Sequence, residues 1–177
     1  MMRLLVTISL IILLLTPVIA ADAPHPAMRA NGFDLTAAFS QPTSGRGRSR
    51  AVNGVEHWDV VTTPGRAANG TFRMREVLIY DEGGERLQDW TIRDAGDGRF
   101  VGTRPDLKGP AVFRPAGPGR LKYKWTQYGD ADGTGGTITL RGELRLRSGG
   151  TIVNSATAYK FAVPLGRVRV VFHPERG

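Results

Sequence analysis

The chain has 177 residues, a formal net charge of +8 at pH 7 and no cysteine. This length suits one domain with a single core, and the lack of cysteine excludes a disulfide framework, thiolate chemistry and a lipidated N-terminal cysteine. The positive charge favours contact with anionic surfaces.

The first twenty residues have the pattern of a secretory signal peptide. Arg3 precedes a predominantly apolar run, Leu4–Leu15, and Val18-Ile19-Ala20 places small or branched residues before the expected cut. The run is shorter than the roughly 20 residues that span a bilayer, which disfavours the alternative of an uncleaved anchor. We therefore predict a signal peptide over residues 1–20 and export to the periplasm.

The segment that follows is rich in Pro and Ala and shows no periodicity, so we predict a disordered leader over 21–30. The rest of the chain, 31–177, is predicted to form a single domain. Its first element is a short helical turn within Phe33–Phe39, with Phe33 and Ala37 facing inward.

Beyond this turn, apolar residues alternate with polar ones, as in strands with one dry and one wet face. Thr137–Arg147 is the best example, because Ile138, Leu140, Leu144 and Leu146 share one face. The other segments with this pattern are Val55–Thr62, Thr71–Tyr80, Arg86–Arg93, Arg99–Thr103, Leu121–Tyr128, Thr151–Val163 and Arg167–His173.

The segments between these strands are short and rich in Gly, Asp, Asn and Pro, which favours hairpins over βαβ crossovers. We predict an all-β domain, a single antiparallel meander of eight or more strands that forms a closed or nearly closed β-barrel, because closure removes exposed edges. An open two-sheet sandwich is the alternative.

One strand carries an acidic residue on its apolar face. Glu76 shares this face with Met74 and Leu78, and a carboxylate in an apolar interior is costly unless it is paired or protonated. Arg86 or Gln88 on the next strand could pair with it across the hairpin. Glu76 is therefore either a structural pair that fixes register, a polar anchor for a ligand, or an acid or base.

Four aromatic residues, Trp58, Trp90, Tyr123 and Trp125, lie where the interior of a barrel would be. They could simply fill the core. They could also form the apolar wall of a small-molecule site, since such sites are mostly apolar with few polar groups.

The basic residues include two stripes at strand spacing. Arg46, Arg48 and Arg50 project from one side of an extended segment, and Arg141, Arg145 and Arg147 share the wet face of a strand. They form either a solvated surface or a contact with anionic lipid. An exported protein rarely meets nucleic acid, so we do not expect that partner.

Other motifs do not support metal or catalytic chemistry. Asp130–Gly135 is similar to the start of a calcium loop, but Arg141 stands where the bidentate Glu is needed. The three histidines are too scattered to bind a metal, and His57 and Asp59 have no serine nucleophile motif beside them. We predict no metal, no cofactor and no catalytic residue.

The C-terminal half carries the most specific pattern in the chain. Its members are Asn154, Ala156-Thr157, Lys160-Phe161, Gly166 and Phe172. Further matches upstream are Glu76, Tyr80-Asp81-Glu82-Gly83, Trp90, Gly98, Phe100, Gly102, Gly109 and Ala111. In these positions the chain resembles the bacterial domain-of-unknown-function 3833 family of exported proteins, over roughly residues 33–173.

This resemblance implies a lipocalin-like barrel and a loose connection with fatty-acid modification. It implies no established activity, so no catalytic residue is transferred to this chain.

From these observations we expect a non-enzymatic periplasmic protein that binds a lipid-like or other apolar small molecule in a barrel lumen. The interior of an eight-stranded barrel holds either side chains or one small ligand. The predicted ligand-binding residues are Glu76, Arg86, Trp58, Trp90, Tyr123 and Trp125. The alternatives are an envelope structural or interaction protein with a basic surface and an accessory enzyme of fatty-acid modification. An anionic membrane surface is a second expected partner, and the oligomeric state stays open.

Overall fold

The computed structural model describes residues 27–29, 32–129 and 136–175. The predicted signal peptide over 1–20 and the calcium-like segment Asp130–Gly135 lie outside these residues. Of the leader predicted over 21–30, the structure describes residues 27–29. Ala27 is buried. Met28–Arg29 forms strand β1, which pairs with β2 (Gly32–Phe33). The described fold therefore begins before residue 31.

The described chain is almost entirely β-structure. After β2 come α1 (Leu35–Ala38), β3 (Thr43–Ala51), β4 (Gly54–Ala68), β5 (Thr71–Tyr80), β6 (Glu85–Asp94), β7 (Phe100–Thr103) and β8 (Ala111–Pro115). They are followed by β9 (Arg120–Tyr128), β10 (Thr137–Leu146), the 3₁₀ turn η1 (Ser148–Gly150), β11 (Ile152–Lys160) and β12 (Val163–Pro174). Among the described residues, no helix is long and apolar enough to cross a membrane.

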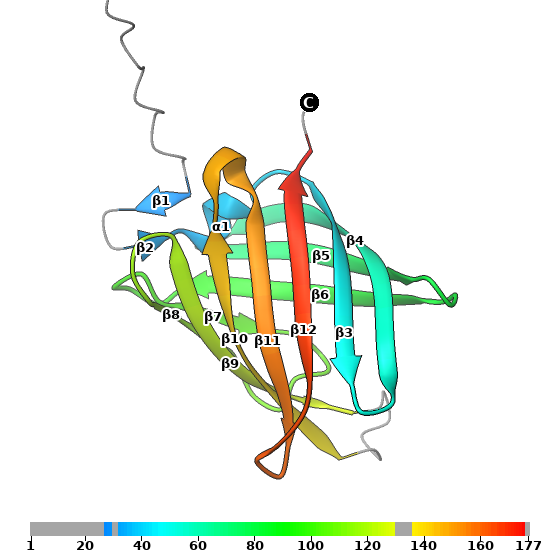
Figure 1. Cartoon of the computed structure of the whole chain (residues 1–177). Helices are drawn as coiled ribbons and strands as arrows, with labels where there is room; N and C mark the ends of the chain where they lie inside the picture. The colour runs from blue at the N-terminus through cyan, green and yellow to red at the C-terminus, as the bar shows by residue number, and fades with distance from the viewer. Residues whose placement is uncertain (1–26, 30–31, 130–135, 176–177) are drawn as a thin grey trace, which may run out of the picture.

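Strands β3 to β12 form one closed barrel in which each strand pairs antiparallel with its neighbour in the sequence. The ring closes where β12 pairs with β3, from Gly166 opposite Ala51 to Pro174 opposite Thr43. In Figure 1 the near strands β11, β12 and β3 cross the far strands β5 and β6 steeply, which reflects the strand tilt that closure requires. The predicted antiparallel barrel is confirmed, and the closed ring excludes the open sandwich.

The barrel has strands that the alternation of apolar residues did not reveal. β3 and β8 are additional to the predicted set. The predicted strand Thr151–Val163 is wrong at its end, because Phe161 and Ala162 have positive φ angles and form the turn between β11 and β12. The diameter of a barrel grows with its strand number, so these additions widen the lumen.

Alternate residues along each strand face the interior. On β10, Leu144 is buried and Ile138 and Leu140 line the lumen, as the alternation over Thr137–Arg147 predicted. The core continues around the ring through side chains that include Val60, Ile92, Phe100, Leu121, Ile152 and Val170.

One end of the barrel is covered by α1 (Figure 1). Asp34 caps this short helix, since its Oδ1 accepts hydrogen bonds from the backbone N–H groups of Thr36 and Ala37 at 3.0 and 3.1 Å. Leu35 and Phe39 are buried and reach the lumen, and the ring of Phe39 packs edge-on against Phe172 of β12. The predicted helical turn is confirmed.

Candidate functional site in the barrel lumen

The barrel encloses a cavity of about 360 Å³. Its walls are mainly apolar and aromatic, and it extends from Leu35 and Phe39 beneath α1 to Ser49 and Glu56 near the other end. All six residues predicted to bind a ligand line this one cavity, namely Trp58, Glu76, Arg86, Trp90, Tyr123 and Trp125. The structure thus brings them together; that they bind a ligand stays a prediction.

Three of the aromatic residues form a continuous wall. The rings of Tyr123 and Trp125 stack with centroids 4.4 Å apart and an interplanar angle of 13°. Trp90 meets Trp125 edge-on, with centroids 5.5 Å apart. Trp58 belongs to a separate part of the lining and packs against Tyr80 at 5.9 Å. The large rings therefore narrow the lumen without filling it.

Two of these rings lie against glycine on the neighbouring strand. Gly47 pairs with Trp58, and a Cβ atom at this glycine would lie 2.2 Å from Cε2 of the indole. Gly142 pairs with Tyr123, and its Cβ would lie 2.5 Å from Cζ of the phenol ring. Both glycines therefore allow an aromatic ring to rest on the barrel wall, which keeps the centre of the lumen open.

Glu76 of β5 is the acidic residue inside this cavity. Its Oε2 accepts a hydrogen bond from Nε1 of Trp90 at 3.2 Å. Burial raises the pKa of Glu76 above its ordinary value, and this effect outweighs the opposing charge of Arg104, the Trp90 hydrogen bond and the charge of Arg86. A carboxyl group that retains its proton can donate a hydrogen bond as well as accept one.

The partners expected for Glu76 make their hydrogen bonds elsewhere. Gln88 is directly opposite Glu76 in the sheet, but its Oε1 accepts from Nη1 of Arg104. Arg86 donates from Nη2 to Oδ2 of Asp106 at 2.8 Å. The expected hydrogen bond between Glu76 and Arg86 or Gln88 is therefore wrong. The donor to Glu76 is Trp90, which lies diagonally across the hairpin.

Arg104 is the residue of this site that the sequence did not reveal. Its side chain is 3% exposed and donates to both carboxylate oxygens of Asp106, at 2.5 and 2.9 Å, and to Oε1 of Gln127 at 3.2 Å. Its guanidinium also lies over the ring of Trp90, 4.6 Å from the centroid. The only signal in the sequence is the Arg104-Pro105-Asp106 spacing after a strand, which is weak.

Two further polar groups in the lining are buried. The hydroxyl of Tyr123 donates to Oδ1 of Asn154 at 2.5 Å, and burial raises the pKa of this phenol, so it stays neutral. Nε1 of Trp58 is buried without a hydrogen-bond partner among the described residues. Such an orphaned donor is uncommon in a folded protein.

Six polar side chains of the site form one cluster at the wall of a mainly apolar chamber, while Ser49, Glu56 and Asn154 line other strands. This polar cluster consists of Glu76, Arg86, Gln88, Arg104, Asp106 and Gln127. In the described part of the chain, no group of three or more His, Asp or Glu residues is placed to hold a metal ion. The arrangement suits a molecule with an apolar body and one hydrogen-bonding end.

Comparison with known families places nearly the whole chain in one family model. The model of a family described as a protein of unknown function, DUF3833, matches residues 12–174, which include all the barrel strands and all six predicted cavity residues. Against curated proteins the chain gave no match.

Proposed function

The chain belongs to the DUF3833 family of proteins of unknown function, and from its cavity we propose that it is an exported, non-enzymatic binding protein for one small lipid-like molecule. The observation that carries this proposal is the combination of a mainly apolar chamber with a polar cluster at its wall. Export is inferred from the N-terminal pattern over residues 1–20.

The size of the cavity limits the ligand. Ligand pockets occupy about 300–1,000 Å³, and a volume of about 360 Å³ is near the lower limit. A single acyl chain or a comparable apolar molecule matches this space better than a phospholipid with two chains. The aromatic wall of Trp90, Tyr123 and Trp125 supplies flat apolar surface for such a body.

Glu76 is the group best placed to hold the polar end of the ligand. Arg104 already directs its hydrogen bonds to Asp106, Gln88 and Gln127. Glu76 faces the cavity and, within the part of the chain that the structure describes, accepts only the Trp90 hydrogen bond. With its raised pKa, the carboxyl group can bind a hydroxyl, ester or carboxylic acid.

The ligand would enter at the end of the barrel away from α1. Glu56 lines the cavity from the same face of β4 as Trp58, yet its side chain is exposed. It lies close to the turn between β3 and β4. The lumen therefore reaches solvent beside this turn, while Leu35 and Phe39 cover the other end.

Native mass spectrometry of protein purified from the periplasm of its own host tests the proposal. We expect a retained lipid-like mass, and displacement of that molecule by the fluorescent apolar probe N-phenylnaphthylamine. Ala158→Phe would fill the lumen, since Ala158 lines the cavity, and should abolish probe binding. Thr157→Phe places the same ring on the outer face and is the matched control.

Both variants must first give the β-sheet circular dichroism spectrum of the wild type. A clean apo mass together with probe binding that Ala158→Phe leaves unchanged would contradict a ligand in the lumen.

A further inference from the structure

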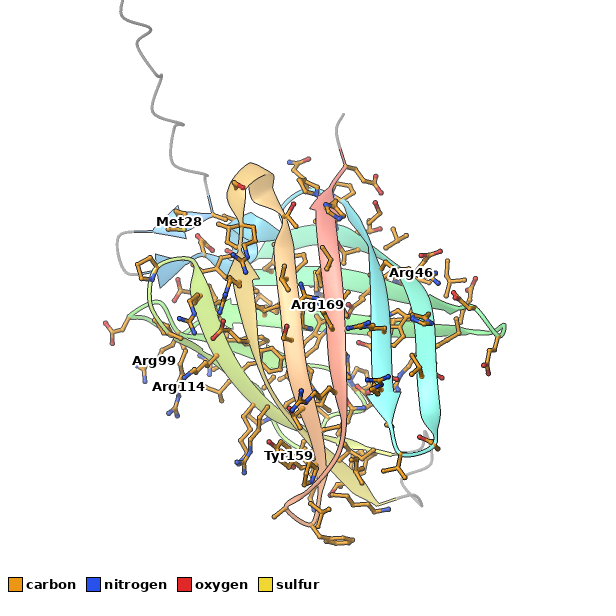
Figure 2. All side chains as sticks on the ribbon, viewed as in Figure 1. Met28, Arg46, Arg99, Arg114, Tyr159 and Arg169 are labelled. Atoms are coloured by element: carbon orange, nitrogen blue, oxygen red, sulfur yellow. The ribbon has the colours of Figure 1, made fainter. Side chains whose placement is uncertain are left out.

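The outer wall of the barrel carries a square of four arginines. Arg167 pairs directly with Arg50, and Arg169 with Arg48, across the seam between β12 and β3. Arg141 of β10 and His57 of β4 extend this face, and the side chains border a groove of about 670 Å³. Figure 2 shows Arg169 on this wall. We call Arg48, Arg50, Arg141, Arg167 and Arg169 the basic groove.

The arginines of the basic groove lack acidic partners among the described residues. In the described part of the chain none of the five makes an ion pair, although Arg141 lies over the ring of Tyr159. Like charges directly opposite one another destabilise a sheet. This fold therefore tolerates a local cost that an anionic partner would remove.

Other arginines that the sequence placed with this group are neutralised. Arg46 binds Asp59 and Asp81, and Arg145 binds Glu143. Arg73, Arg93 and Arg147 also make no ion pair with the described residues, but they do not border the basic groove. What distinguishes the basic groove is that two pairs of its arginines are directly opposite each other across the seam.

An exposed apolar tip lies at the end of the same wall. Phe161, in the turn between β11 and β12, is 92% exposed, and Val163, the first residue of β12, is 60% exposed. Val52, in the turn between β3 and β4, is 97% exposed. The two turns lie at the same end of the barrel, where Gly166 of β12 pairs with Ala51 of β3, and Val52 and Pro164 border one surface groove. We call Val52, Phe161 and Val163 the apolar tip.

The turn that carries Phe161 is also strained. Phe161 and Ala162 have φ angles of 49° and 67°, values that L-residues other than Asn and Asp rarely adopt. Backbone strain and a solvent-exposed aromatic ring both oppose stability, and Asn-Gly would remove both. Their presence at a loop beside the basic groove points to a role in contact.

We propose that this face docks the barrel on the surface of an anionic lipid bilayer. The basic groove binds lipid phosphate groups, for which guanidinium forks are suited, and the apolar tip enters the interfacial region. A soluble polyanion would account for the arginines but not for the exposed Phe161. The docking site is distinct from the lumen and does not depend on the proposed ligand.

Docking in this orientation has a consequence for the lumen. Glu56 at the cavity mouth follows the same β3–β4 turn that carries Val52. The mouth would therefore face the bilayer from which a lipid-like molecule is taken or to which it is delivered.

Vesicle flotation tests the docking site. The purified protein is mixed with vesicles of phosphatidylglycerol and phosphatidylcholine in equal parts, or of phosphatidylcholine alone, and we expect it to float only with the former. A double variant, Arg167→Gln with Arg169→Gln, should weaken binding about 30-fold, from about fivefold for each arginine. Its folded state should be at least as stable as the wild type, since it relieves like-charge pairs.

The matched control is Arg73→Gln with Arg93→Gln, which removes the same charge from exposed positions on β5 and β6. It should bind almost as the wild type does. For the apolar tip, Phe161→Ser should weaken binding several-fold, whereas Ile79→Ser, at a 42% exposed position on β5, should not.

Three results would overturn the proposal. They are equal loss of binding in the two double variants, equal flotation with both vesicle types, and tight binding to soluble dextran sulfate without binding to anionic vesicles.

Discussion

Glu76 illustrates how one half-buried side chain inside the barrel can make stability depend on pH. Its pKa is raised from 4.5 because burial disfavours the charged form. In the pH range between 4.5 and the raised value, the folded state holds a proton that the unfolded state has lost. The favourable contribution of this group is therefore complete below pH 4.5 and is lost as the pH rises through the folded pKa.

The first prediction follows from this loss of stability with rising pH. Glu76→Gln keeps an acceptor for Nε1 of Trp90 but cannot ionise, so the wild type should lose stability relative to the variant as the pH rises from acid to neutral. Urea unfolding of both proteins across this range measures the difference. If the difference in the free energy of unfolding does not vary with pH, Glu76 is not desolvated in the folded state.

For single residues, the sequence predicted which side chains face the lumen better than it predicted their hydrogen-bond partners. The parity of Glu76 on its strand placed it inside correctly, because the side chains of a strand alternate strictly. Its hydrogen-bond donor, Trp90, lies two residues beyond the directly opposite Gln88, and alternation does not distinguish the two. Arg104 could not be predicted, since its partners come from β6, β9 and its own loop and meet only once the ring has closed.

At the scale of elements, β3 shows how a strand can lack an apolar face. Its inward positions include Gly45 and Gly47, so the sequence offers no hydrophobic alternation. The interior side of β3 is instead covered by the apolar ring of Trp58 from β4, which lies over Gly47. The pattern predicted an extended segment through Arg46, Arg48 and Arg50, but only the pairing with β4 and β12 makes it a barrel strand.

The second prediction tests this packing. In Gly47→Ala the added Cβ would lie within 2.6 Å of three ring atoms of Trp58, so the indole must move into the lumen. We expect a loss of about 1–3 kcal/mol in the free energy of unfolding and weaker binding of N-phenylnaphthylamine. Denaturant unfolding and probe titration measure the two effects. Unchanged values in both would show that the ring can rearrange freely.

The third prediction concerns the strained turn between β11 and β12. Asn and Gly adopt positive φ angles more readily than Phe and Ala, so Phe161→Asn with Ala162→Gly should raise the free energy of unfolding by about 1 kcal/mol. The same change should weaken flotation with anionic vesicles. A drop in thermal stability would mean that Phe161 packs against the protein and is not held out for contact.

At the scale of the whole molecule, the seam between β12 and β3 decides whether a barrel exists. Residues 43–51 must meet residues 166–174, at opposite ends of the described chain. Such long-range pairing is entropically costly to form, and without it β3 and β12 would both be open edges. The alternation of residues favoured closure only because exposed edges are unfavourable; it did not identify which strands would meet.

The fourth prediction follows from the seam. A chain that ends at Lys160 lacks β12 and should lose cooperative unfolding altogether, because two edges and one side of the core are exposed. Thermal melts followed by circular dichroism, together with size-exclusion chromatography, compare it with the wild type. A soluble truncated form that melts cooperatively would show that the remaining strands close without β12.

The width of the lumen is also a property of the whole ring. The alternation over the predicted strands set a minimum of eight, for which side chains nearly fill the interior. β3 and β8 bring the ring to ten strands, and a residual cavity of about 360 Å³ remains. The size of the cavity could not be predicted, because it depends on the two strands with the weakest sequence signals.

The seam also means that the ring has no natural first strand. Every barrel strand pairs with its sequence neighbour, and the link from β12 back to β3 differs from the others only in lacking a covalent connection. The backbone N–H of Glu175 already donates to the carbonyl oxygen of Pro42, so the chain leaves the barrel beside the place where it enters. The starting point of the polypeptide is therefore incidental to the architecture, and circularly permuted chains opened at another hairpin would contain the same set of strand pairings.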